Sequence, residues 1–267
     1  MASVPAKVAD RLASGLKRFQ PVLASAKARD VNESDTSMIV TDILAEIFGF
    51  EKYSEITREH CIRGTFCDLA IKLDGKLHFI IEVKAAGLDL KDPHVKQAID
   101  YAANQGVDWV ILTNGLIWKV FKVIFGKPIN QELVLDMDLS LFNHRNSANI
   151  ESLYNLTREG LTKGVLPAYQ VQQQATNKFF LSAVVVSDPV VDAIRRELRR
   201  LSPDVKIKND DIRASLMNEV LKREVVEGEK AEDARKKLQR VAAKMLRNSK
   251  AKDTAGPDES PAPEPAG

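Results

Sequence analysis

The spacing of apolar residues predicts that the chain opens with two helices. An apolar stripe with a period of three to four residues predicts the first helix over about residues 5–27. In the second helix, Ile43 and Ile47 lie four positions apart on one face. Asn32 can act as its N-cap, and Gly49 stands where a helix end favours a left-handed residue.

Short apolar runs bounded by turn residues predict β-strands in the next part of the chain. Asp74-Gly75 and Asn114-Gly115 are typical hairpin turns. The expected strands cover residues 54–59, 66–73, 77–85, 107–113 and 117–123.

A helix is expected between the third and fourth of these strands. Asp92 can be its N-cap, Pro93 suits the first helical position, and Gly106 ends it after about Asn104. Residues 77–113 therefore predict a strand–helix–strand unit with two parallel strands and a right-handed crossover.

From about residue 147 the pattern becomes helical, with acidic and basic residues mixed. Asp188 and Pro189 predict one helix start, and a last charged helix is expected over 229–248. Residues 250–267 hold four prolines and no large apolar residue, which predicts disorder.

Charge is nearly balanced overall but uneven along the chain. The net charge of +2 over 267 residues gives no general nucleic-acid signal. Residues 190–250, however, hold 17 Lys or Arg and 11 Asp or Glu. Four arginines fall within two helical turns and can meet DNA phosphates, although a solvated or partner-facing helix is an equal alternative. They are Arg195, Arg196, Arg199 and Arg200.

Cysteine content and hydropathy favour a cytoplasmic protein. Cys61 and Cys67 are the two cysteines, and their spacing forms neither a disulfide framework nor a zinc motif. No apolar stretch approaches the length of a membrane span. Residues 1–28 are basic and amphipathic, as in a transit peptide, but a helix packed on the domain explains their apolar stripe better.

A set of polar residues interrupts the apolar strands and is the main candidate site. Glu82 and Lys84 share one face of a strand in the run 78–86, where burying charge is costly without partners or a function. Asp68, Glu82 and the carbonyl of Val83 offer the hard oxygen ligands that Mg²⁺ prefers. Lys84 beside them can position or deprotonate a water, or offset phosphate charge. A plain structural ion pair is the alternative for Glu82 and Lys84.

This site sets a condition on the hairpin. Residues paired across an antiparallel hairpin share a face, and their numbers have a constant sum. A two-residue turn at Asp74-Gly75 gives paired residue numbers a sum of 149, whereas pairing Asp68 with Glu82 requires a sum of 150. We therefore expect an odd-length loop or a β-bulge.

Two helices can add groups to this site. Gln97 and Tyr101 are four residues apart on one face of the helix that follows Lys84. Gln97 can hydrogen-bond a metal-bound water or Lys84, and Tyr101 can contact a phosphate, support Gln97 or simply pack. Glu33 lies at the edge of the apolar face of the second helix, where it is a candidate fourth acid or only a first-turn charge.

The ordered residues Glu33, Asp68, Glu82-Val83-Lys84 and Gln97-x-x-x-Tyr101 resemble the PD-(D/E)XK nuclease superfamily. Over residues 30–125 they resemble, more narrowly, the N-terminal nuclease domain of type I restriction enzyme R subunits. The stretches 32–36 and 109–115 add to this likeness.

The resemblance implies an α/β fold, namely a restriction-endonuclease-like mixed sheet flanked by helices, here with a helical C-terminal extension. It implies Mg²⁺ held by Asp68 and Glu82, a catalytic Lys84, a supporting Gln97 and Tyr101, and cleavage of DNA. Together with the patterning of the rest of the chain, the expected parts are an N-terminal helix (1–30), a nuclease-like domain (31–145), a partly basic helical extension (146–249) and a disordered tail (250–267).

Two departures from the family pattern are visible. Cys67 replaces the nominal proline before Asp68, and no Gly-x-x-x-x-Gly-Lys-[Ser/Thr] phosphate loop is present to power a helicase motor. The alternatives are therefore a non-catalytic module that binds DNA or protein, or a subunit of a larger restriction complex. DNA and restriction-system subunits are the expected partners, no membrane is expected, and the oligomeric state is left open.

Overall fold

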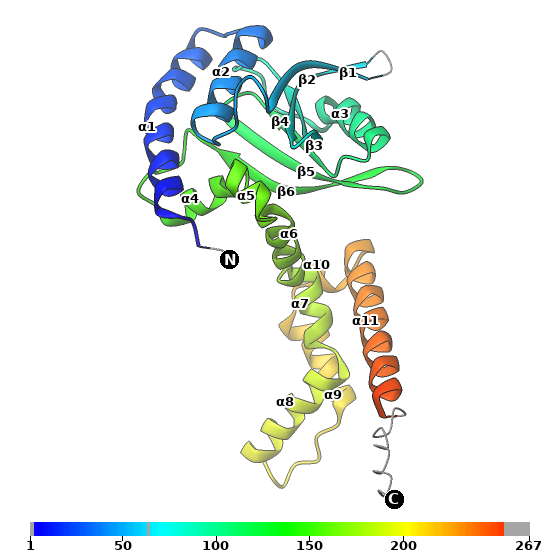
Figure 1. Ribbon diagram of the computed structural model, residues 1–267. Coiled ribbons are helices and arrows are strands. Elements are labelled where there is room, and N and C mark those ends of the chain that lie inside the picture. The colour runs from blue at the N-terminus through cyan, green and yellow to red at the C-terminus, as the bar shows by residue number, and fades with distance from the viewer. Residues whose placement is uncertain (1–2, 63–64, 254–267) are drawn as a thin grey trace, which may run out of the picture. The chain divides into compact units, whose positions relative to one another are not determined.

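The computed structural model describes residues 3–62 and 65–253, and it confirms the α/β fold class (Figure 1). The chain divides into two compact units, residues 1–171 and 172–267. The division falls inside helix α6 (Val165–Ala175). The domain boundaries expected from the sequence stay predictions.

Unit 1 is built on a six-stranded sheet in the order β1-β2-β3-β4-β5-β6. β3 and β4 are parallel, as predicted, and every other neighbouring pair is antiparallel. The elements before α6 are α1 (Ala6–Ala28), α2 (Glu33–Glu46), β1 (Ile56–Ile62), β2 (Thr65–Leu73), β3 (Lys76–Val83), α3 (Asp92–Gln105), β4 (Trp109–Thr113), β5 (Ile117–Ile124), β6 (Asn130–Asp138), α4 (Ser147–Tyr154) and α5 (Arg158–Thr162).

Both faces of the sheet are buried, each against different helices. Ile81 and Ile111 point into a large core that α1, α2 and α4 complete. Ile80 and Val110, one position away on the same strands, point into a second core closed by α3. Figure 1 shows α3 on the other side of the sheet from α1. Strand alternation therefore divides one apolar run between two cores.

Most predicted helix ends are confirmed, and one is wrong by a residue. The Asn32 side chain accepts a hydrogen bond from the Asp35 backbone N–H at 2.9 Å. Gly49 and Gly106 take the left-handed conformation, with φ of 81° and 66°. The N-cap of α3, however, is Lys91 rather than Asp92, because Lys91 is extended (φ −119°, ψ 158°) and Asp92 is the first helical residue.

β6 is the strand that sequence patterning missed. It runs along the sheet edge, and Leu135 and Met137 are its buried side chains. Two buried positions give too little alternation to predict a strand without its partner β5.

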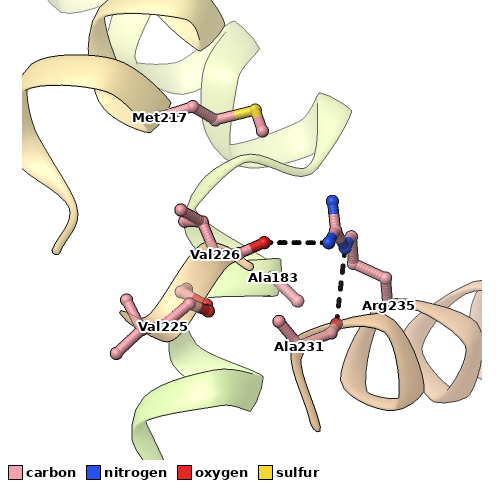
Figure 2. Close-up of a pocket in the computed structure, with 7 residues that line it drawn as sticks. Ala183, Met217, Val225, Val226, Ala231 and Arg235 are labelled. Carbon is pink, nitrogen blue, oxygen red and sulfur yellow. Dashed lines mark hydrogen bonds between the residues drawn. The ribbon is translucent and has the colours of Figure 1, made fainter. Parts of the chain in front are cut away.

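Unit 2 is helical. Ser182 Oγ donates a hydrogen bond to the Val225 carbonyl at 2.9 Å, and Arg235 donates to the Val226 carbonyl at 2.9 Å. Figure 2 shows Val225, Val226 and Arg235 beside a cavity of about 10 Å³, too small for a ligand. The helices are α7 (Lys178–Val185), α8 (Asp188–Leu201), α9 (Asn209–Ser215), the π-helix η1 (Leu216–Val220), α10 (Arg223–Val226) and α11 (Glu229–Asp253).

The predicted helix start at Asp188 is confirmed. The last helix runs further than expected, since residues 250–253 belong to α11 rather than to a disordered tail. The remainder of the predicted tail, residues 254–267, lies outside the described residues.

Candidate functional site

A β-bulge in the β2–β3 hairpin sets the register of the candidate site. Asp74 and Gly75 form a two-residue turn with φ of 50° and 77°. Lys72 pairs with Leu77, but Ile71 pairs with Phe79, so the ladder shifts by one residue. The bulge that the site required is therefore confirmed.

The shifted register puts the two candidate carboxylates on one face. Leu69 pairs with Ile81, so Asp68 stands opposite Glu82 on the face that α3 covers. The Asp68 Oδ2 atom also accepts a hydrogen bond from the Val83 backbone N–H at 2.7 Å. This bond ties the carboxylate of β2 to the end of β3.

Lys84, which directly follows β3, connects β3 to α2. Its ammonium Nζ lies 2.6 Å from Glu82 Oε1 and 3.5 Å from Glu33 Oε2 at the start of α2. The side chains of Glu82 and Lys84 are only 13% and 16% exposed, whereas that of Glu33 is 50% exposed. Glu33, a candidate on weak grounds in the sequence, thus reaches Lys84 from the solvent side.

The site has more negative than positive charge, which perturbs its pKa values. Burial is the largest influence on Glu82 and raises its pKa. The hydrogen bond from Lys84 works against this, but repulsion by Asp68 and Glu33 adds to the rise. One ammonium is shared among three carboxylates, so the site favours an additional cation.

The pKa of Lys84 is raised as well. Burial by itself lowers it, yet the hydrogen bond and the attraction of Glu82 outweigh burial, and Glu33 and Asp68 attract the ammonium further. Lys84 is therefore a protonated cation at neutral pH in this arrangement.

The candidate site provides few possible metal ligands. Among the side chains that the structure describes, no group of three or more His, Cys, Asp or Glu is arranged to hold a metal ion. Asp68 and Glu82 provide two carboxylates beside the backbone of Val83. Because Mg²⁺ retains several waters and needs only one or two protein carboxylates, this donor set fits a hydrated Mg²⁺.

Thr36 connects the start of α2 to the backbone beyond Lys84, a role that sequence reasoning missed. The Thr36 hydroxyl, which is buried, donates to the Asn32 carbonyl at 2.7 Å and accepts the Ala86 N–H at 3.1 Å. It therefore holds the α2 turn that bears Glu33 against the segment that follows Lys84. Its position four residues after the Asn32 N-cap was the signal available in the sequence.

The α3 residues are placed differently from one another. Tyr101 is buried in the second core and hydrogen-bonds the thiol of Cys67, whose pKa burial raises to about 11. This placement favours packing over contact with a phosphate. Gln97 is exposed and makes no hydrogen bond to Glu82 or Lys84 among the described residues. Its supporting role stays a prediction.

The four arginines of α8 split into two pairs. Arg195 is bound to Asp192 at 3.2 Å and Arg200 to Glu197 at 2.9 Å. Arg196 and Arg199 are exposed and form no ion pair in the part of the chain that the structure describes. These two retain free charge for a phosphate, while their neighbours are partly neutralised. Their DNA-binding role stays a prediction.

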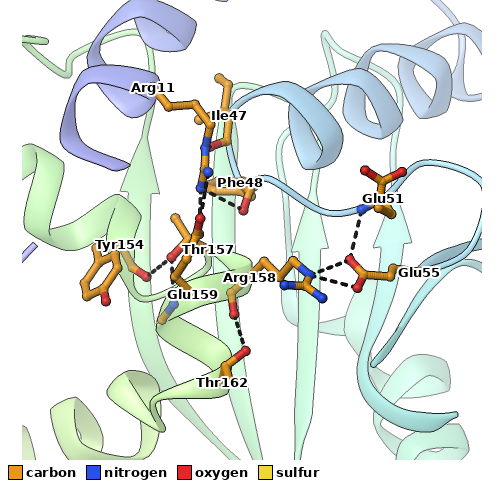
Figure 3. Close-up of polar contacts among 11 residues, drawn as sticks. Arg11, Ile47, Phe48, Glu51, Glu55, Tyr154, Thr157, Arg158, Glu159 and Thr162 are labelled. Carbon is orange, nitrogen blue, oxygen red and sulfur yellow. Dashed lines mark hydrogen bonds and ion pairs between the residues drawn. The ribbon is translucent and has the colours of Figure 1, made fainter. Parts of the chain in front are cut away.

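A second charged cluster in unit 1 had no local signal in the sequence (Figure 3). Arg11 of α1 binds both carboxylate oxygens of Glu159 at 2.7 Å and donates to the Ile47 carbonyl at 3.1 Å. Arg158 Nε lies 2.8 Å from Glu55 Oε1. Arg11 and Glu159 are 148 positions apart, so no spacing rule could pair them.

Comparison with known proteins agrees in part with the family resemblance. Residues 50–134 match the family described as type I restriction enzyme R protein N terminus. The matched segment contains Asp68, Glu82 and Lys84, but it excludes Glu33. No curated protein and no solved structure matches the chain. The match supports a relation to restriction enzymes, while membership of the PD-(D/E)XK superfamily stays a prediction.

The described helices were also compared with the requirements of a membrane span. Within residues 3–62 and 65–253, none combines the length and the apolar content that a crossing helix needs.

Proposed function

We propose that the chain is a Mg²⁺-dependent endonuclease that hydrolyses DNA phosphodiester bonds in a restriction-related role. The observation that carries this proposal is the convergence of Asp68, Glu82 and Lys84 at the end of β3. The bulge brings the two carboxylates to one face, and the charge excess favours a cation. The match over residues 50–134 supports the restriction-related context.

In this proposal Asp68 and Glu82 hold the metal, with the Val83 carbonyl as a further oxygen ligand. Bound Mg²⁺ would supply charge neutralisation to the attacked phosphate. The Val83 N–H keeps the Asp68 carboxylate in place by its hydrogen bond.

Lys84 acts as a cation in this proposal rather than as a base. In that role it donates hydrogen bonds and offsets the charge that the phosphate gathers. Glu33 and Glu82 hold the ammonium on two sides. Gln97, exposed on α3, is proposed to support a water or a phosphate oxygen once DNA is bound.

Plasmid nicking tests the proposal. Wild type should nick supercoiled plasmid with Mg²⁺ and stop with EDTA, and Asp68→Asn, Glu82→Gln and Lys84→Ala should each lose about 100-fold or more in rate. Asp108→Asn is a matched control, since Asp108 is a partly exposed acid paired with Lys122 in the same unit. Equal nicking by all five proteins would attribute the activity to a contaminant.

A second candidate function follows from the name of the matched family. That family consists of the N terminus of R proteins of type I restriction enzymes. We infer that other restriction-system subunits are partners of this chain. Activity that appears only after addition of such a subunit would favour this role, whereas full activity of the chain by itself would remove it.

A further inference from the structure

A groove on the surface of unit 1 has the composition of a nucleotide site. It lies between α2, the turn that follows it and β1, with a volume of about 350 Å³, which is within the range of small-ligand sites. Its lining residues are Met38, Thr41, Asp42, Lys52, Tyr53, Ile56 and Arg58.

The groove presents an aromatic ring and a cation to solvent. Tyr53 is 94% exposed and Met38 is 55% exposed, so two large side chains suited to contact with a base lack cover. Lys52 is bound to Asp42 at 2.6 Å, which neutralises its charge. Arg58 is exposed and has no ion pair among the described residues, so it is the free cation of the groove.

Helix α2 runs from the candidate site to the groove. Glu33, Ser37 and Thr41 are spaced by four residues on one stripe of this helix, and the Thr41 hydroxyl donates to the Ser37 carbonyl at 2.7 Å. Glu33 meets Lys84 at one end of the stripe, and Thr41 lines the groove at the other. Eight residues of helix span about 12 Å.

The sheet shows on which side the groove lies. Arg58 of β1 pairs with Leu69 of β2, so its side chain is on the α2 side of the sheet, whereas Asp68 is on the α3 side. The connection between Lys84 and the groove therefore runs along α2.

We propose that this groove binds an unpaired nucleotide of the DNA strand beside the cleaved bond, with the base on Tyr53 and Met38 and a phosphate on Arg58. The inference rests on the proposed function and adds to it a preference for DNA with an unpaired segment. Every base has a face that can stack on an aromatic ring, so the groove is insensitive to base identity.

Fluorescence anisotropy in EDTA separates binding from cleavage. A labelled single-stranded 20-mer and the corresponding duplex serve as probes for wild type, Tyr53→Ala, Tyr53→Phe and Arg58→Ala. Arg145→Ala is the control for Arg58, because Arg145 is an exposed arginine of unit 1 outside the groove.

Tyr53→Ala should weaken binding of the single strand about tenfold and of the duplex less than twofold, while Tyr53→Phe stays near wild type. Arg58→Ala should reduce the slope of log Kd against log salt by about 0.7, and Arg145→Ala should leave it unchanged.

Any other outcome contradicts either the nucleotide-site proposal, the nuclease proposal or both. Wild-type affinity in Tyr53→Ala, or equal losses for single strand and duplex, would exclude the nucleotide site and leave the nuclease proposal standing. The expected losses without any nicking by wild type would keep the groove and remove the nuclease. Absence of DNA binding by wild type would remove both.

Discussion

Two charged clusters in unit 1 differ in their balance of charge. The α1–α5 cluster consists of Arg11, Arg158, Glu55 and Glu159, with two cations for two anions (Figure 3). The β3-end cluster consists of Asp68, Glu82, Lys84 and Glu33, with one cation for three anions.

One glutamate in each cluster has a shifted pKa, and the two shifts are opposite in direction. The hydrogen bond from Arg11 is the main reason that the pKa of Glu159 is lowered. Burial is the main reason that the pKa of Glu82 is raised. Folding therefore favours the ionised form of Glu159 and disfavours the ionised form of Glu82. Matched charge thus indicates a structural role, and unmatched charge indicates a place for a cationic ligand.

The largest expected effect separates the two clusters by activity. Lys84→Ala should lower the Mg²⁺-dependent cleavage rate by about 100-fold to 10,000-fold, because it removes the only ammonium of the β3-end cluster. Arg158→Ala in the other cluster should retain the wild-type rate. Initial nicking rates of the two variants are measured at matched protein concentration. A comparable loss of rate in Arg158→Ala would contradict the assignment of a functional role to one cluster and a structural role to the other.

The next largest effect is on stability, and here the α1–α5 cluster is the sensitive one. Arg11→Ala should lower the free energy of unfolding by about 2 kcal/mol, because it breaks a bidentate ion pair and two hydrogen bonds to carbonyls at the end of α2. This figure allows for solvent screening of the ion pair, since the side chains of Arg11 and Glu159 are about a third exposed. Urea unfolding measures it. Arg18→Ala on the same helix is the control, and its exposed pair with Glu46 should contribute less than about 0.5 kcal/mol.

A smaller effect should link α2 to the β3-end cluster. Thr36→Val keeps the shape but removes the hydroxyl that accepts the Ala86 N–H, so it should cost about 1 kcal/mol in unfolding and reduce cleavage. Thr36→Ser should restore most of both. If cleavage by the valine variant changed only in proportion to its folded fraction, Thr36 would not be a positioning residue.

The smallest effect is a pH dependence of opposite sign in the two clusters. Glu159 has a lowered folded pKa, so its stabilisation is complete above the unfolded value of 4.5 and is lost as the pH falls through the folded value. The stability difference between wild type and Arg11→Ala should therefore shrink below about pH 4.5.

Glu82 has a raised folded pKa, so its ionisation costs stability at neutral pH. The stability of wild type relative to Glu82→Gln should therefore rise as the pH falls from 7 through the folded pKa of Glu82. Unfolding curves between pH 3 and 7 check both clusters, and parallel trends would contradict the assignment.

Local patterning predicted most of unit 1. The caps of α2, the Asp74-Gly75 turn and the parallel β3–β4 pair follow from residue types that act on their immediate neighbours. β6 was missed because an edge strand buries few side chains. The α3 cap was misplaced by one residue because Lys91 keeps an extended backbone and the helix already begins at Asp92.

For the candidate site, the sequence alone determined which groups are available and which register they require. Alternation put Glu82 and Lys84 on one face, and the parity of the hairpin demanded a shift if Asp68 was to join them. Only the tertiary structure decided that the bulge occurs, that Glu33 reaches Lys84 from α2, and that Arg11 meets Glu159. The physical reason is range: caps, turns and alternation depend on neighbours within a few residues, whereas the balance of charge around a buried group depends on every element that packs against it.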